Sequence, residues 1–111
     1  MHSLRLLHLE DNDQDADLVR RTLASEHLQC HIVHVSNRKD FEHALGQGGF
    51  DLIVTDYAIP GWNGLEALAC VRALDRAVPF IFFSGALGEE RAVEALRCGA
   101  TDYVLKTRLS R

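Results

Sequence analysis

Strand-like and helix-like segments alternate along the whole chain, and this alternation strongly limits the folds open to it. The strand-like segments are short apolar runs, and the segments between them carry apolar residues at helical spacing. Such alternation predicts parallel strands joined by right-handed crossovers, with helices on both faces of one sheet. We therefore expect a doubly wound, three-layer α/β/α fold with five parallel strands and four helices. The predicted strands are residues 4–9, 31–35, 51–55, 79–83 and 102–105.

Local signals support these boundaries. Asn12 can cap a helix whose first turn is acidic. Leu52–Val54 is a consecutive apolar run, typical of a strand buried on both faces. Pro79 stands at the start of a strand, where its missing N–H does least harm.

Four further expectations concern single elements. We expect residues 31–35 to form an edge strand and Pro60–Gly64 to form a turn. Trp62, in that turn, is either a lid over the hydrophobic face or part of a partner surface. The helix beginning at Glu89 should place Ala92, Val93 and Leu96 inward.

Composition narrows the class of protein. The chain has 111 residues, of which 47% are hydrophobic, so we expect one domain with one core. The net charge of −4 argues against a nucleic-acid-binding face. No apolar stretch is long enough to cross a membrane, and no signal peptide is evident. Cys30, Cys70 and Cys98 form no CxxC motif, so we interpret them as buried thiols in a reducing cytoplasm.

Five polar residues each follow an apolar run that should be a strand: Glu10, Asp11, Asp56, Ser84 and Lys106. In doubly wound sheets the binding site lies at the carboxyl ends of the strands. We therefore expect these five side chains to converge at one rim of the sheet.

This set of residues suits phosphoryl transfer. Neighbouring carboxylates repel one another unless a cation compensates them, and Mg²⁺ or Mn²⁺ accepts oxygen ligands. Asp56 is the natural nucleophile, while Glu10 and Asp11 orient the metal and its waters. Lys106 and Ser84 can stabilise the phosphoryl oxygens, and the product is an acyl phosphate.

The order of residues resembles the response-regulator receiver domain, a CheY-like family with a flavodoxin-like fold. The resemblance runs from Leu4 to Lys106. It is carried by five motifs in the right order and spacing: Leu9–Asn12, Asp51–Tyr57, Pro60–Gly64, Phe83–Gly85 and Gly99–Lys106.

The resemblance implies a phosphorelay module that receives its phosphoryl group from a histidine kinase or a histidine phosphotransfer protein. It does not imply a free-standing enzyme, although such domains catalyse their own aspartyl phosphorylation and dephosphorylation. By resemblance, Asp56 is the phosphoacceptor, Glu10, Asp11, Asp56 and the Ala58 carbonyl bind the metal, Ser84 and Lys106 contact the phosphoryl group, and Ser84 and Tyr103 form the switch.

A finer resemblance is to receivers attached to PAS domains and histidine kinases, carried by residues 8–12, 84–90, 102–106 and 109–111. Two features depart from the family. Thr107 replaces the usual proline, so we expect a trans Lys106–Thr107 bond. The chain also stops before a fifth helix, so we expect residues 1–111 to be a receiver domain cut from a longer multidomain protein.

A missing final helix would uncover apolar side chains near the first and last strands and could allow a homodimer. The candidates are Leu4, Leu6, Val104 and Leu109.

Other readings of the same residues stay open. A pseudo-receiver that only binds partners is one, although the intact acidic pocket and lysine count against it. Another is a free-standing phosphatase or phosphotransferase with an aspartyl intermediate, but such enzymes usually need a second aspartate two residues after the nucleophile, where this chain has Ala58. Tyr103 could simply be a half-buried strand residue. We interpret His8, His31 and His34 as packing or hydrogen-bonding residues on strands.

Overall fold

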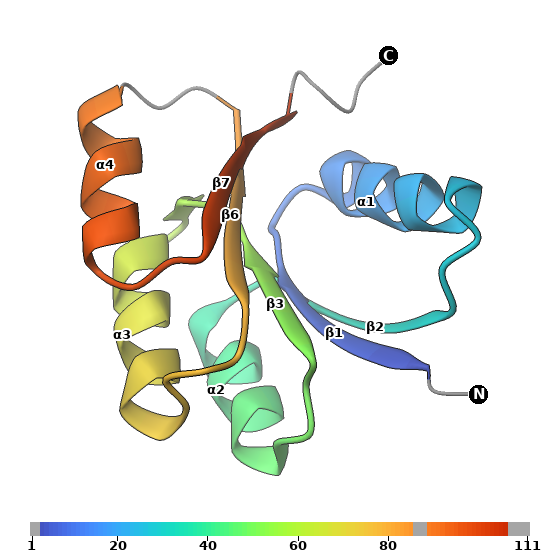
Figure 1. The fold of residues 1–111 in the computed structure, drawn as a ribbon, viewed down its shortest axis with the longest axis horizontal. Coiled ribbons are helices and arrows are strands. Elements are labelled where there is room, and N and C mark those ends of the chain that lie inside the picture. The colour runs from blue at the N-terminus through green and yellow to red at the C-terminus, as the bar shows by residue number, and fades with distance from the viewer. Residues whose placement is uncertain (1–2, 86–88, 107–111) are drawn as a thin grey trace.

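The computed structural model describes residues 3–85 and 89–106. Its elements alternate as expected, and Figure 1 shows the central sheet with helices on both sides. The elements are β1 (Leu4–Leu9), α1 (Asp13–Ser25), β2 (Cys30–Val35), α2 (Arg38–Gln47), β3 (Leu52–Thr55), β4 (Ala58–Ile59), β5 (Trp62–Asn63), α3 (Gly64–Leu74), β6 (Phe80–Ser84), α4 (Glu89–Arg97) and β7 (Asp102–Leu105).

The main sheet has five parallel strands in the order β2-β1-β3-β6-β7. This order confirms the doubly wound fold and places β2 at an edge, as predicted. The chain reverses its direction of travel across the sheet between β1 and β3. Ligand sites of such folds lie beside this switch point, at the carboxyl ends of the strands.

Each face of the sheet has its own apolar core. On one face, α2, α3 and α4 cover a cluster that includes the fully buried Phe41, Leu68 and Phe82. On the other, α1 packs over Leu6 and Phe83 in a smaller cluster. Alternate residues of each strand serve opposite faces, so both cores hold the strand ends in place.

Three helices begin at an asparagine. Asn12, Asn37 and Asn63 each accept a hydrogen bond from the backbone N–H three residues later, at distances of 3.0, 2.8 and 3.0 Å. These bonds satisfy amide groups that have no partner inside the helix. The predicted cap at Asn12 is confirmed, and it starts α1 immediately after the acidic pair.

One element-level expectation held only in part and another was wrong. Pro60–Gly61 forms a turn, as predicted, but Ala58–Ile59 and Trp62–Asn63 on either side of it pair antiparallel in a small hairpin, and Gly64 begins a helix. In α4, Val93 and Leu96 are 47% exposed rather than inward. The helix buries Ala95 fully instead, because a small side chain lets it lie close to the sheet.

Other expectations had mixed outcomes. Cys98 is exposed, and Cys30 and Cys70 are only partly buried, so the prediction of buried thiols was wrong. His31 is exposed, so of the two roles expected for it, packing is wrong. The Lys106–Thr107 bond and Leu109 lie outside the described residues. Within the described ranges, every helix is too short or too polar to cross a bilayer.

Candidate functional site

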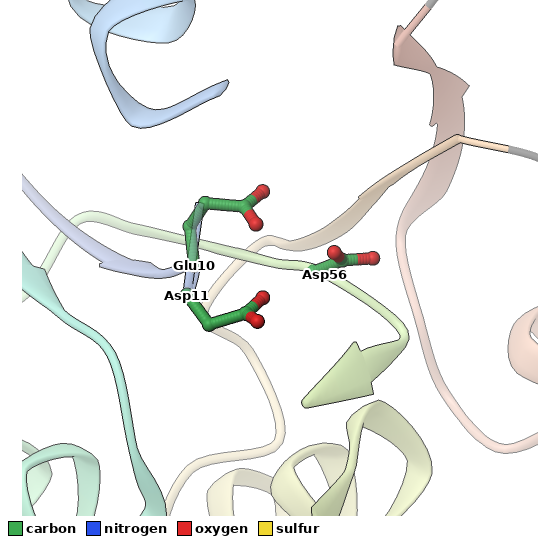
Figure 2. A group of neighbouring side chains, drawn as sticks. All are labelled: Glu10, Asp11 and Asp56. Carbon is green, nitrogen blue, oxygen red and sulfur yellow. The ribbon is translucent and has the colours of Figure 1, made fainter. Parts of the chain in front are cut away.

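The carboxyl ends of β1 and β3 bring three carboxylates together. A backbone hydrogen bond fixes these two strand ends side by side, because Asp56 N donates to Leu9 O at 3.0 Å, and Glu10 N in turn donates to Val35 O at the end of β2 at 2.9 Å. Figure 2 shows Glu10, Asp11 and Asp56 gathered at this rim. Each offers an oxygen, and these three oxygens lie within 4.8 Å of one another.

The three carboxylates differ in their burial. Glu10 is fully buried and Asp56 is 8% exposed, whereas Asp11 is exposed. Burial raises the pKa of the Glu10 carboxyl to about 7, against the hydrogen bond to Lys106 and with help from the nearby charge of Asp56. Concentrated negative charge with little solvent is costly, so this rim favours a bound cation.

Lys106 supplies one cation in the structure. Its Nζ lies 3.0 Å from Glu10 Oε1, 3.0 Å from Asp56 Oδ2 and 2.7 Å from Asp15 Oδ2. Burial alone would lower the pKa of this ammonium, but the hydrogen bonds to Asp15, Glu10 and Asp56 outweigh it and raise the pKa. Lys106 is therefore charged, and it holds the end of β7 against the carboxylates.

Asp15 is a contact that the sequence did not reveal. It lies in the first turn of α1, where an acidic residue has an ordinary explanation as a partner of the helix dipole. Its distance of 91 residues from Lys106 gave no signal of an ion pair.

Ser84 completes the surroundings of Asp56. Its hydroxyl donates to Asp56 Oδ1 at 2.9 Å, while Lys106 contacts the other oxygen, Oδ2. Both oxygens of Asp56 thus face groups that donate hydrogen bonds. The same donors can bind oxygens of a phosphoryl group attached to Asp56.

Tyr103 lies on β7 beside β6, with its ring 6.3 Å from the ring of Phe82. Its hydroxyl is buried and has no hydrogen-bond partner among the described residues. Burial also raises the pKa of this phenol. The side chain is thus placed near Ser84 and Asp56 as the resemblance implied, while its role as a switch stays a prediction.

A groove of about 830 Å³ opens beside the carboxylates. Asp11, Ala58 and Trp62 line it, together with residues of α4. The Trp62 side chain is largely buried and packs edge-on against Phe41 at 5.7 Å between ring centroids. Of the two readings of Trp62, the structure favours a lid over the hydrophobic core.

Two histidines lie directly behind the acidic pair. His34 Nε2 lies 2.8 Å from the Glu10 carbonyl oxygen, to which it can donate. His8 is buried beside His34, with 5.8 Å between their rings. The expectation that both are packing or hydrogen-bonding residues is confirmed.

The oxygen donors of this rim fit a hard divalent cation. Glu10, Asp11 and Asp56 offer three carboxylate oxygens from two adjacent strand ends, with Ala58 on the same groove as Asp11. Mg²⁺ and Mn²⁺ are bound by such sets, usually together with several waters. The described residues therefore can hold the metal that the sequence predicted.

The response regulator receiver domain family matches residues 6–110, nearly the whole chain. The chain belongs to this family. Similar curated proteins include the swarming motility regulation protein RssB of Serratia marcescens, 36% identical over 103 residues, and the regulatory protein AtoC of Escherichia coli, 30% identical over 102 residues. These alignments cover 93% and 92% of this chain but only 46% and 22% of the relatives, so the receiver spans less than half of each.

Solved structures agree. A response regulator from Hahella chejuensis superposes with a TM-score of 0.86 at 30% identity, covering 96% of this chain and 82% of that one. The Mn²⁺-bound response regulator Rcp1 has the same fold, with a TM-score of 0.82 at 22% identity, covering 95% of this receiver and 82% of Rcp1. The chain is thus a receiver domain of the two-component response regulator type, and the pseudo-receiver alternative has no support.

Proposed function

We propose that this receiver takes a phosphoryl group from a phosphohistidine onto Asp56 and thereby switches an interaction with a partner or an attached domain. The observation that carries the proposal is the environment of Asp56. Its carboxylate is largely buried, contacts Ser84 and Lys106 through separate oxygens, and lies beside Glu10 and Asp11.

The chemistry is a simple displacement. One Asp56 oxygen attacks phosphorus, the P–N bond of the donor breaks, and its electron pair stays on the imidazole, which takes up a proton. Lys106 and Ser84 donate to the oxygens on which negative charge develops. The product is an acyl phosphate, and water later returns it to the free carboxylate and inorganic phosphate.

We propose Mg²⁺ or Mn²⁺ as the cofactor, held by Glu10, Asp11, Asp56 and the Ala58 carbonyl. When bound, the metal neutralises charge on the phosphoryl oxygens and on the three carboxylates. Few protein ligands hold it, so we expect an affinity weaker than micromolar.

Removal of one carboxylate tests the metal site. Asp11→Ala should abolish Mg²⁺-dependent quenching of Trp62 fluorescence, because Asp11 and Trp62 line one groove. Asp13→Asn is the matched control, because Asp13 lies two residues further along the chain and is not one of the three clustered carboxylates. This variant should bind Mg²⁺ as the wild type does. Unchanged binding by Asp11→Ala would remove Asp11 from the site.

Mass spectrometry tests the phosphoryl transfer. Incubation with Mg²⁺ and phosphoramidate should add one labile phosphoryl group to the intact protein. The addition should be lost in Asp56→Asn and retained in Asp13→Asn. A protein that takes no phosphoryl group from any donor would return the pseudo-receiver to consideration.

The wider setting is also part of the proposal. We propose a histidine kinase or phosphotransfer protein as the donor, because receiver domains of this family interact with such proteins. Unpaired Cys30, Cys70 and Cys98 support a reducing, cytoplasmic location. Attachment to PAS or kinase domains, a homodimer and the extent of the domain as residues 1–111 stay predictions.

A further inference from the structure

The ammonium of Lys106 is surrounded by three carboxylates, each within 3.0 Å of Nζ. Nζ donates hydrogen bonds to Asp15 Oδ2 and Asp56 Oδ2 and forms an ion pair with Glu10 Oε1. Two of them, Glu10 and Asp56, belong to the cluster of three carboxylates at the rim of the sheet. The third, Asp15, comes from α1 and makes the shortest contact of the three, at 2.7 Å.

Asp15 differs from the other two in its position. It is not a member of the group whose oxygens converge for a metal. Its side chain is 30% exposed, whereas those of Glu10 and Asp56 are 0% and 12% exposed. Its backbone N–H is bound to the Asn12 cap, so the helix start fixes the residue beside Lys106.

We propose that Asp15 is a positioning residue that holds Lys106 toward α1 and competes with the phosphoryl group on Asp56 for its ammonium. This inference rests on the proposed function. A phosphoryl group that forms on Asp56 draws on the Lys106 ammonium, which already donates to Asp15 and Asp56. Asp15 is the partner whose release breaks no contact of the metal ligands.

The consequence is a limit on how strongly the receiver retains its phosphoryl group. Without the Asp15 charge, Lys106 can turn fully toward the added group. Because the ion pair is partly exposed, the gain should be modest, about three- to fivefold in affinity for a phosphoryl mimic.

Beryllofluoride titration at saturating Mg²⁺ tests the proposal in the whole chain. Asp15→Asn should bind the mimic about three- to fivefold more tightly than the wild type. Asp13→Asn removes an equal charge from the same helix turn and should leave the affinity unchanged. Asp15→Glu restores the charge and should restore most of the wild-type affinity.

A double variant separates positioning from simple charge removal. If Asp15 acts through Lys106, Asp15→Asn should give no gain in a Lys106→Ala background. The NMR signal of the Lys106 Cε methylene should also move in Asp15→Asn and not in Asp13→Asn. Either an equal gain without Lys106 or an unmoved Lys106 signal would overturn the inference, whereas a wild type that binds no beryllofluoride would contradict the proposed function itself.

Discussion

At the scale of single residues, His8 is a titratable side chain buried close to the charged residues of the site. Its imidazole is fully buried, and Nε2 has no hydrogen-bond partner among the described residues. Burial, together with the neighbouring His34, lowers the pKa of His8 from 6.5 to about 4. The native state therefore keeps this side chain neutral.

This shift predicts a dependence of stability on pH. The unfolded chain binds a proton at His8 near pH 6.5, whereas the native state does so only near pH 4, so acidification between these values favours unfolding. The loss should reach roughly 2–3 kcal/mol. The free energy of unfolding, measured in urea across this pH range, should fall in the wild type relative to His8→Leu as the pH is lowered.

The wild type must be compared with His8→Leu because Glu10 titrates in the same pH range, and its effect on stability runs opposite to that of His8. Its raised pKa means that the native state holds a proton the unfolded chain has lost, so its contribution to stability falls as pH rises from 4.5 to about 7. Both proteins share that contribution. Parallel curves for wild type and His8→Leu would show that His8 is not the group responsible.

The sequence predicted five site residues because each follows an apolar run: Glu10, Asp11, Asp56, Ser84 and Lys106. The structure places Glu10, Asp11 and Asp56 in one group, with Ser84 and Lys106 bonded to Asp56. Asp15 could not be predicted in this way, because its contact depends on how α1 lies over the strand ends. Alternation along a chain gives the rim to which a strand leads, but not the rotation of a helix above it.

At the scale of elements, the start of α3 fixes the chain that leaves Asp56. Gly64 N donates to Tyr57 O at 2.6 Å. A Cβ added at Gly64 would lie 2.3 Å from Phe82 Cε1 and 2.9 Å from the Asp56 carbonyl oxygen. The helix can approach the loop after β3 this closely only because residue 64 has no side chain.

Gly64→Ala should therefore destabilise the fold by about 1–3 kcal/mol, through a clash with buried atoms. Gly46→Ala is the matched control, since nothing lies within 4 Å of a Cβ there and alanine favours a helix. The control should stabilise the fold by about 0.5–1 kcal/mol in urea unfolding. Equal effects of the two substitutions would contradict the close packing at α3.

A second element-scale prediction concerns β6 and β7, which pair Phe82 with Tyr103 and Ser84 with Leu105. A phosphoryl group on Asp56 should draw Ser84 toward it and change the space beside Tyr103. The coupling should be about 1–3 kcal/mol. Beryllofluoride should change the Tyr103 rotamer population measured by NMR, and Ser84→Ala should suppress the change. An identical population with and without the mimic would exclude this route.

Elements were predicted well where apolar periodicity was strong and less well where it was short. The five sheet strands were found because each is an apolar run between breakers. The hairpin of Ala58–Ile59 and Trp62–Asn63 was missed because two-residue strands leave no period to detect. In α4, the spacing of Val93 and Leu96 predicted that they face inward. The helix lies close to the sheet, however, and buries the smaller Ala95 instead.

At the scale of the whole molecule, the fold separates stability from chemistry. Two apolar clusters, one on each face of the sheet, hold the strands, while the three clustered carboxylates of Glu10, Asp11 and Asp56 lie at the carboxyl ends of β1 and β3. Chain order alone predicts this division, because parallel strands must end at the same rim. The ion pairs of Lys106 with Glu10 and Asp56 could not be predicted from chain order, because they depend on how the folded strands place these side chains.

Chemical trapping can locate the phosphoryl group by residue and so tests the assignment of Asp56 as phosphoacceptor. After incubation with Mg²⁺ and phosphoramidate, borohydride reduces an aspartyl phosphate to homoserine, which peptide mass spectrometry can identify. If Asp56 is the phosphoacceptor, homoserine appears at position 56 alone, and none appears when the metal is chelated. Homoserine at Asp11, Asp15 or any other position, with Asp56 unmodified, would contradict this assignment.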